Sequence, residues 1–438
     1  MTLKISAPSD YLAAESRADR PLPRSRGNFL IWYQTMVLGA ALGAIYSNLP
    51  IYAYVLSPAL LPKFFYFGIV FAITPLILLK FHAFSAYLLS PFALWASLLL
   101  LLNLVHFAGL SMGGGWGATY IIGHHIDARE ALVATRIQYI LFSIFLGFAA
   151  YTSSHTKYLK PVVCLMVALP VAVLLDFARP GLLYPIETEG AVLGRAAAMF
   201  INPTMAGEAV LTVFLIGCAV LGIRNRVPLF FLSGAAVIAT FSRSSIIAWV
   251  LIMLILTVKR SLPKSAVITA ALVLGLSVIF LSSFENYLDS RRELEAASSN
   301  ILSRLDFFSS FKFDDDSSEE RAAVIRGGWE LFLQNPVFGA GAGATQFWAH
   351  RGSTHNQLLL LAAEYGIFGI SMWVWLVIIL WKGRFFKERG LQLAMVFLFV
   401  FMSMFTHQML DAASYWLATA ALISIRKKAG QLPPDRGR

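Results

Sequence analysis

Apolar stretches of membrane-spanning length alternate with short polar segments along almost the whole chain. A helix needs about 20 apolar residues to cross the hydrocarbon core of a bilayer. Charged residues are also scarce: they make up 13% of the chain, against 58% hydrophobic residues, and the mean hydropathy is +0.69. The pattern predicts an all-α integral membrane protein with about twelve transmembrane helices. The predicted spans lie near residues 29–48, 64–80, 85–110, 131–152, 160–177, 196–221, 227–242, 244–259, 264–283, 356–381, 391–407 and 411–425.

The distribution of lysine and arginine predicts the orientation of these spans. Twelve spans place seven of the connecting and terminal segments on the same side of the membrane as the N-terminus, and these seven contain 22 of the 35 basic residues. Basic residues accumulate in loops that are not translocated. Both termini are therefore expected in the cytoplasm. The chain is then divided into a cytoplasmic tail, nine spans, a long periplasmic loop, three further spans and a second tail, at residues 1–28, 29–283, 284–354, 355–425 and 426–438.

Charge and cysteine content exclude several classes of protein. The net charge of +11 comes from loops between spans and not from one basic patch, so it does not indicate nucleic-acid binding. Both cysteines, Cys164 and Cys218, lie in apolar stretches, which argues against a disulfide or a thiolate metal site. The polar first 28 residues contain no short apolar core, so the first span is expected to be an uncleaved anchor.

The long loop changes character at Ser317. Before it, the segment is acidic and lacks the alternating oxygen ligands of a calcium loop. Ser317 and Glu320 have capping-box spacing and predict a short helix that ends at Asn335, just before Pro336. The helix carries Arg321 and Arg326, which by themselves could equally be cations at the membrane surface.

A glycine-rich turn and a histidine follow this helix. Gly339, Gly341 and Gly343 could turn backbone N–H groups toward an anion, or form only a flexible turn. His355 and Asn356 lie at the start of the tenth span, where water meets hydrocarbon. A histidine there suits a general base for a hydroxyl nucleophile, although it could also be a solvated interfacial residue.

Two further arginines are expected on the same, outward side of the membrane. Arg243 lies between the seventh and eighth spans with essentially no loop, and Arg195 precedes the sixth span, which Asn202 and Pro203 are expected to break. The guanidinium fork fits a phosphate group in bidentate fashion. The pattern therefore favours a phosphate-bearing ligand. Structural pairing with outward carboxylates such as Glu187, Glu189 or Glu208 remains the alternative.

Together these motifs resemble the O-antigen ligase and O-antigen polymerase superfamily. The resemblance covers roughly residues 190–375. It depends on three motifs in order: a Ser-Arg pair between spans, an arginine upstream of a Pro-x-x-Gly-x-Gly turn, and His-Asn ahead of Glu-x-Gly-x-x-Gly. In this sequence they are Ser242-Arg243, Arg321 with Pro336 to Gly341, and His355-Asn356 with Glu364 to Gly369.

The resemblance implies a membrane glycosyltransferase. Its donor would be a glycan on undecaprenyl diphosphate, and its acceptor a hydroxyl of lipid A core at the periplasmic face of the bacterial inner membrane. Arg243 and Arg321 would hold the diphosphate, and His355 would activate the acceptor. Further substrate contacts are expected from Arg195, Asn202, Arg326, Gly339, Gly341 and Asn356, and no metal or cofactor is required.

Two other functions remain open. A polymerase would use the same donor with a carrier-linked glycan as acceptor, and the motifs do not separate it from a ligase. A lipid or glycan transporter is favoured less, because transporters place their ionisable residues near the midplane between repeats, whereas these gather at one face.

Overall fold

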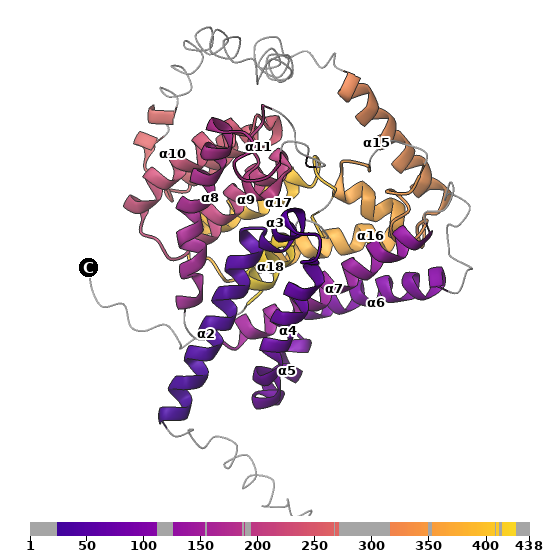
Figure 1. Cartoon of the computed structure of the whole chain (residues 1–438), viewed down its shortest axis with the longest axis horizontal. Helices are drawn as coiled ribbons and strands as arrows, with labels where there is room; N and C mark the ends of the chain where they lie inside the picture. Colours follow the sequence, from indigo (N-terminus) through magenta and orange to yellow (C-terminus); the bar gives the residue numbers. More distant parts are fainter. Residues whose placement is uncertain are drawn as a thin grey trace, which may run out of the picture.

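The protein is a bundle of helices in the part of the chain that the computed structural model describes (Figure 1). Those residues are 24–111, 126–153, 156–185, 188, 194–266, 268–270, 316–348, 353–407, 409–410 and 414–425, and they contain no strand. The predicted all-α class is thus confirmed for them. The α-helices are α2 (Arg24–Tyr46), α3 (Leu49–Leu56), α4 (Pro62–Leu79), α5 (Phe81–Leu88), α6 (Pro91–Ser111), α7 (Ile126–Tyr151), α8 (Lys160–Ala178), α9 (Pro203–Cys218), α10 (Ile223–Ala239), α11 (Arg243–Val258), α15 (Asp316–Gln334), α16 (Gln357–Lys382), α17 (Arg389–Met402) and α18 (Tyr415–Ile423).

Six of the described helical segments are long and apolar enough to cross a membrane, and α9, α11 and α17 are shorter apolar helices. These helices are candidate membrane spans by length and composition, and the count of twelve stays a prediction. Most of the predicted span 264–283 lies outside the described residues. Residues 284–315 of the predicted periplasmic loop also lie outside them.

Three predicted spans have different boundaries in the structure. Residues 85–110 are divided between α5 and α6, because Pro91 begins a new helix and the Ser90 hydroxyl accepts a hydrogen bond from Ala93 N at 3.3 Å. The predicted span 391–407 ends at Met402 in α17. The expected break inside the span 196–221 is present at Ile201 and Asn202: a short 3-10 helix, Ala198–Phe200, lies before it, and Asn202 is the N-cap of α9, which starts at Pro203.

The helix predicted from Ser317 to Asn335 is present as α15, which starts one residue earlier and ends one residue earlier. It packs along α16 (Figure 1). Val324, Gly328 and Leu331 are buried, whereas Ile325 and Trp329 are 43% and 52% exposed. Exposed apolar side chains of this kind are typical of a helix at a membrane surface.

The interior of the bundle is built around α7 and α9. Helix α7 packs against α4, α6 and α18, and α9 packs against α8, α10 and α17. Nearly every residue of α9 is buried, which is typical of a helix surrounded by protein. These two helices carry the residues that hold the polar end of the bundle in place.

Candidate functional site

The glycine-rich turn after α15 packs against a kink in α16. At the kink, Gly366 has φ +63°, a conformation that L side chains rarely adopt. Three backbone hydrogen bonds join the turn to the kink: Ala340 N to Ala363 O at 2.8 Å, Gly341 N to Glu364 O at 3.0 Å, and Ile367 N to Pro336 O at 2.9 Å. The two motifs that were separate in the sequence therefore form one structural unit.

Close backbone contact explains the glycines of this unit. A Cβ atom at Gly339 would lie 2.3 Å from the carbonyl carbon of Glu364, and one at Gly366 would lie 2.3 Å from Val337 O. The N–H groups of Gly339 and Gly341 donate to the carbonyls of Asn335 and Glu364. These two amides are thus used within the protein, and their predicted contact with substrate stays a prediction.

Replacing Gly339 by alanine should destabilise the protein by about 1–3 kcal/mol or more. The left-handed backbone at this position disfavours a side chain, and the new methyl group would overlap the backbone of Glu364. Gly68→Ala in α4 is the matched control, since no heavy atom lies within 4 Å of its Cβ position. Thermal unfolding of the purified variants in detergent measures the difference. Equal midpoints for the two variants would show that the turn is not held against α16.

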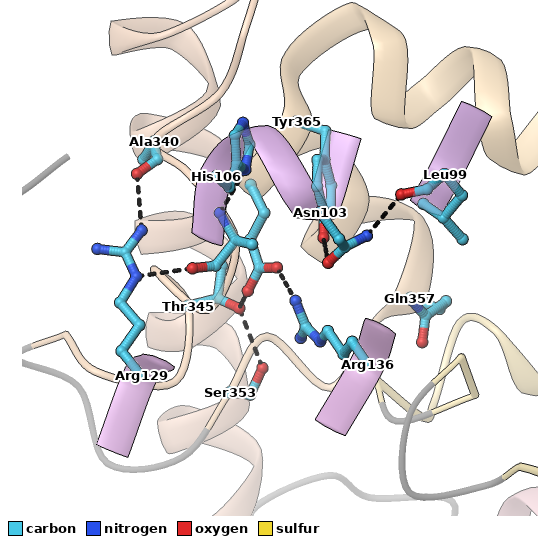
Figure 2. Close-up of polar contacts among 12 residues, drawn as sticks. Leu99, Asn103, His106, Arg129, Arg136, Ala340, Thr345, Ser353, Gln357 and Tyr365 are labelled. Atoms are coloured by element: carbon cyan, nitrogen blue, oxygen red, sulfur yellow. Dashed lines mark hydrogen bonds and ion pairs between the residues drawn. The ribbon is translucent and has the colours of Figure 1, made fainter. Parts of the chain in front are cut away.

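A buried carboxylate, Glu364, is the centre of a polar network, and Figure 2 shows Arg136, Thr345 and Ser353 of this network. Glu364 forms an ion pair with Arg136 of α7, and its other oxygen accepts a hydrogen bond from the Thr345 hydroxyl at 2.7 Å. Ser353 in turn donates to Thr345 at 3.5 Å. A buried charge requires such partners, so α7, the turn and α16 are tied together at one point.

A second set of contacts fixes the turn from α6 and α7 (Figure 2). The Arg129 guanidinium donates to Ala342 O at 2.6 Å and Ala340 O at 3.1 Å. His106 Nδ1 accepts from Ala342 N at 2.9 Å, and its ring stacks on Tyr365 at 5.2 Å. The first half of the chain thus positions the turn in the second half.

His355 lies just before α16, beside a second histidine. Its backbone has φ +49°, and Asn356 caps the helix by accepting a hydrogen bond from Leu359 N at 2.9 Å. The ring of His407, in the connection between α17 and α18, meets the His355 ring edge-on with centroids 5.0 Å apart. Burial and the nearby His355 and Arg136 lower the pKa of His407 to about 3, so His407 is neutral at physiological pH.

The start of α16 is anchored beside this pair. The backbone N–H of Gln357 donates to Ser403 O at 2.7 Å, and the Gln357 side chain accepts from Met409 N at 2.9 Å. These bonds fix the connection between α17 and α18 that carries His407. His355 itself is only half-buried.

Arg195, Asn202 and Arg243 gather where α9, α10 and α11 meet. Arg243 is the half-buried first residue of α11, and Arg195 Nε donates to Thr240 O at 3.0 Å, beside the end of α10. Asn202 Oδ1 accepts from Thr204 N at 2.9 Å, and the Ser242 hydroxyl donates to the Thr204 hydroxyl at 3.5 Å. The expected alternative partner Glu208 accepts instead from Trp416 Nε1 at 2.6 Å, while Glu187 and Glu189 lie outside the described residues.

The two arginines of α15 were predicted to contribute to the site. Arg326 is exposed on this helix, and the backbone of Arg321 lies in its second turn, while the Arg321 side chain is outside the described part of the structure. Within the described residues, no group of three or more His, Cys, Asp or Glu side chains could hold a metal ion.

Several residues of the site were not found from the sequence. The sequence pattern predicted no site role for Arg129, Arg136, His106, Asp176 or His407. Asp176 accepts from the N–H groups of Ala197 and Ala198 at 2.8 Å and 2.9 Å, which holds the segment that carries Arg195. An ionisable residue inside an apolar span was the available signal for Arg136 and Asp176.

The fold and the site define a multi-pass membrane protein with a polar, arginine-containing and histidine-containing end. A protein-family model described as O-antigen ligase matches residues 228–374, which include Arg243, Arg321, the glycine-rich turn, His355 and Glu364. The predicted resemblance to the O-antigen ligase superfamily is therefore confirmed. A search of curated proteins finds no match to the chain.

Proposed function

We propose that this protein is a glycosyltransferase of the O-antigen ligase type. It moves a glycan from undecaprenyl diphosphate to a sugar hydroxyl of lipid A core at the periplasmic face of the bacterial inner membrane. The observation that carries the proposal is the family match to the segment that contains Arg243, Arg321 and His355. The half-buried His355 beside a neutral His407 supports an acid–base role at that end of the bundle.

The proposed reaction is a direct displacement. The acceptor hydroxyl oxygen attacks the anomeric carbon of the donor, and the bond from that carbon to the phosphate oxygen breaks. Undecaprenyl diphosphate leaves with the bonding electron pair, and His355 takes the proton of the hydroxyl. The anomeric centre is inverted, and no cofactor or metal is needed because diphosphate is already a good leaving group.

Arg243 and Arg321 are proposed to hold the diphosphate. Guanidinium contacts that strengthen as charge accumulates on the leaving group stabilise the transition state more than the bound donor. The contacts that place Arg195 and Asn202 beside the start of α11 support their predicted part in the same donor site. Asn356 contributes by capping α16 next to His355, and the exposed Arg326 is proposed to contact substrate.

The orientation of the chain is tested by cysteine labelling. In a background that carries Cys164→Ser and Cys218→Ala, Ser310→Cys should react from the periplasm and Arg384→Cys from the cytoplasm. Arg384 is exposed after the end of α16, whereas a Cβ at the adjacent Gly383 would lie 2.3 Å from Ile423 O. Impermeant maleimide applied to intact cells and to lysed cells distinguishes the two sides. Labelling of both cysteines from the same side would contradict the proposed topology.

A deletion strain distinguishes ligase from polymerase. Loss of the ligase leaves lipid A core without any attached polymer, while the carrier-linked polymer accumulates. A ladder reduced to one repeat unit on the core would instead identify a polymerase. The electrophoretic pattern of lipopolysaccharide, with complementation by the wild-type gene, gives the answer.

A further inference from the structure

A cavity of about 1040 Å³ lies at the predicted periplasmic end of the bundle, apart from the polar network around Glu364. Pockets for small organic ligands are typically about 300–1,000 Å³, so this cavity has room for a group larger than one sugar ring. It is formed by α3 and the segment that follows it, by α4 and α7, and by the segment that leads into α9. The family match starts at residue 228 and contains none of its lining residues.

Helix α7 separates the cavity from the network. Ala131, Ala134 and Gln138 line the cavity, and their spacing places them on one face of the helix. Arg129 and Arg136 use another face to reach the glycine-rich turn and Glu364. One helix therefore forms a wall of the cavity and also positions the motif that precedes His355.

The lining of the cavity suits sugar hydroxyl groups better than a diphosphate. Among the described residues that line the cavity, Lys63 is the one charged side chain and none is a carboxylate. Within the described part of the chain, no hydrogen bond is recorded for the side chains of Gln138 and Tyr54, so both are available to a ligand. Uncharged amide and hydroxyl groups, set among apolar side chains, are the usual means of orienting a neutral polar ligand.

The cavity also reaches the proposed donor site. Asn202 lines it and caps α9. Thr204 lies in the first turn of α9, two residues after Asn202. Its hydroxyl accepts a hydrogen bond from the hydroxyl of Ser242, the residue before Arg243. A glycan in the cavity would thus end close to the helix start where the donor diphosphate is proposed to bind.

We propose that this cavity binds the glycan of the acceptor glycolipid. Gln138 and Tyr54 hydrogen-bond to its sugar hydroxyls, and the exposed Lys63 meets a negatively charged substituent at the edge. The inference rests on the proposed transferase function and extends it by assigning the acceptor to residues of α3, α4 and α7.

The test fills the cavity and removes its polar groups. Ala134→Trp places an indole in the cavity, and Gln138→Leu removes an amide with little change in volume. Ala235→Trp, at an exposed position of α10 outside the cavity, is the matched control. The probe is core oligosaccharide freed of lipid A by mild acid, titrated calorimetrically into the purified protein in nanodiscs.

The wild type and Ala235→Trp should bind this oligosaccharide, whereas Ala134→Trp and Gln138→Leu should bind at least about tenfold more weakly. In transfer assays the same two variants should raise the acceptor KM and leave the donor KM unchanged. An unchanged acceptor KM in both folded variants would overturn the assignment and indicate that the cavity binds lipid. A rise in donor KM alone would also overturn it and indicate that the cavity binds the donor. A wild type that binds the oligosaccharide and transfers nothing would refute the proposed function and leave the binding site standing.

Discussion

Replacing His355 by alanine should lower the rate of glycan transfer by about 10²–10⁴-fold, the usual contribution of a general base. The donor should remain bound, because the proposed diphosphate contacts come from Arg243 and Arg321. The structure places His355 half-buried at the start of α16, with its ring against a histidine that burial keeps neutral. This position is the basis for proposing that His355 takes the acceptor's proton.

The measurement follows product formation and donor occupancy separately, with purified protein and a carrier-linked glycan. His82→Ala, at an exposed position of α5, is the matched control and should transfer at the wild-type rate. If His355→Ala transferred nearly as fast as wild type, the histidine would be only an interfacial residue. Glu364 and Glu208 would be poor substitutes as the base, since each is buried and bonded to another side chain.

Arg243→Lys and Arg321→Lys should each lower transfer by about 10–100-fold. This corresponds to the loss of one hydrogen bond to a charged group, worth about 1.5–3 kcal/mol in the transition state. Lysine keeps the charge and loses the bidentate fork, so the effect should exceed what charge alone explains. Initial rates at equal protein levels give the comparison.

Arg384→Lys, at the predicted cytoplasmic end of α16, is the control for the same chemical change at an exposed position. It should leave the rate unchanged. If both site variants matched this control, Arg243 and Arg321 would be structural residues, and the donor site would have to lie elsewhere.

The sequence pattern was sufficient for local features of the fold. Apolar length and periodicity predicted the helical class, and the short connection before Arg243 is present between α10 and α11. The break at Asn202 has a local cause. Proline is well tolerated in the first turn of a helix, and asparagine is a favourable N-cap, so Asn202-Pro203 starts α9 and separates it from the short helix Ala198–Phe200.

Contacts between distant segments could not be predicted in the same way. Arg136 and Glu364 are separated by 228 residues and His106 and Ala342 by 236, and no pattern in one sequence pairs them. The glycines showed this limit most clearly. Alternating glycines left an anion-binding turn and a flexible turn both open, and the structure uses Gly339 and Gly366 for close packing of two backbone segments.

In the proposed reaction the glycan leaves undecaprenyl diphosphate and becomes attached to lipid A core. Reconstitution of the purified protein with a carrier whose glycan is radiolabelled, together with unlabelled lipid A core, tests it most directly. We expect label to move to the core with an inverted anomeric linkage, one undecaprenyl diphosphate to be released per glycan, and His355→Ala to suppress both products. Label that stays on the carrier, or that appears only on a longer carrier-linked glycan, would contradict it.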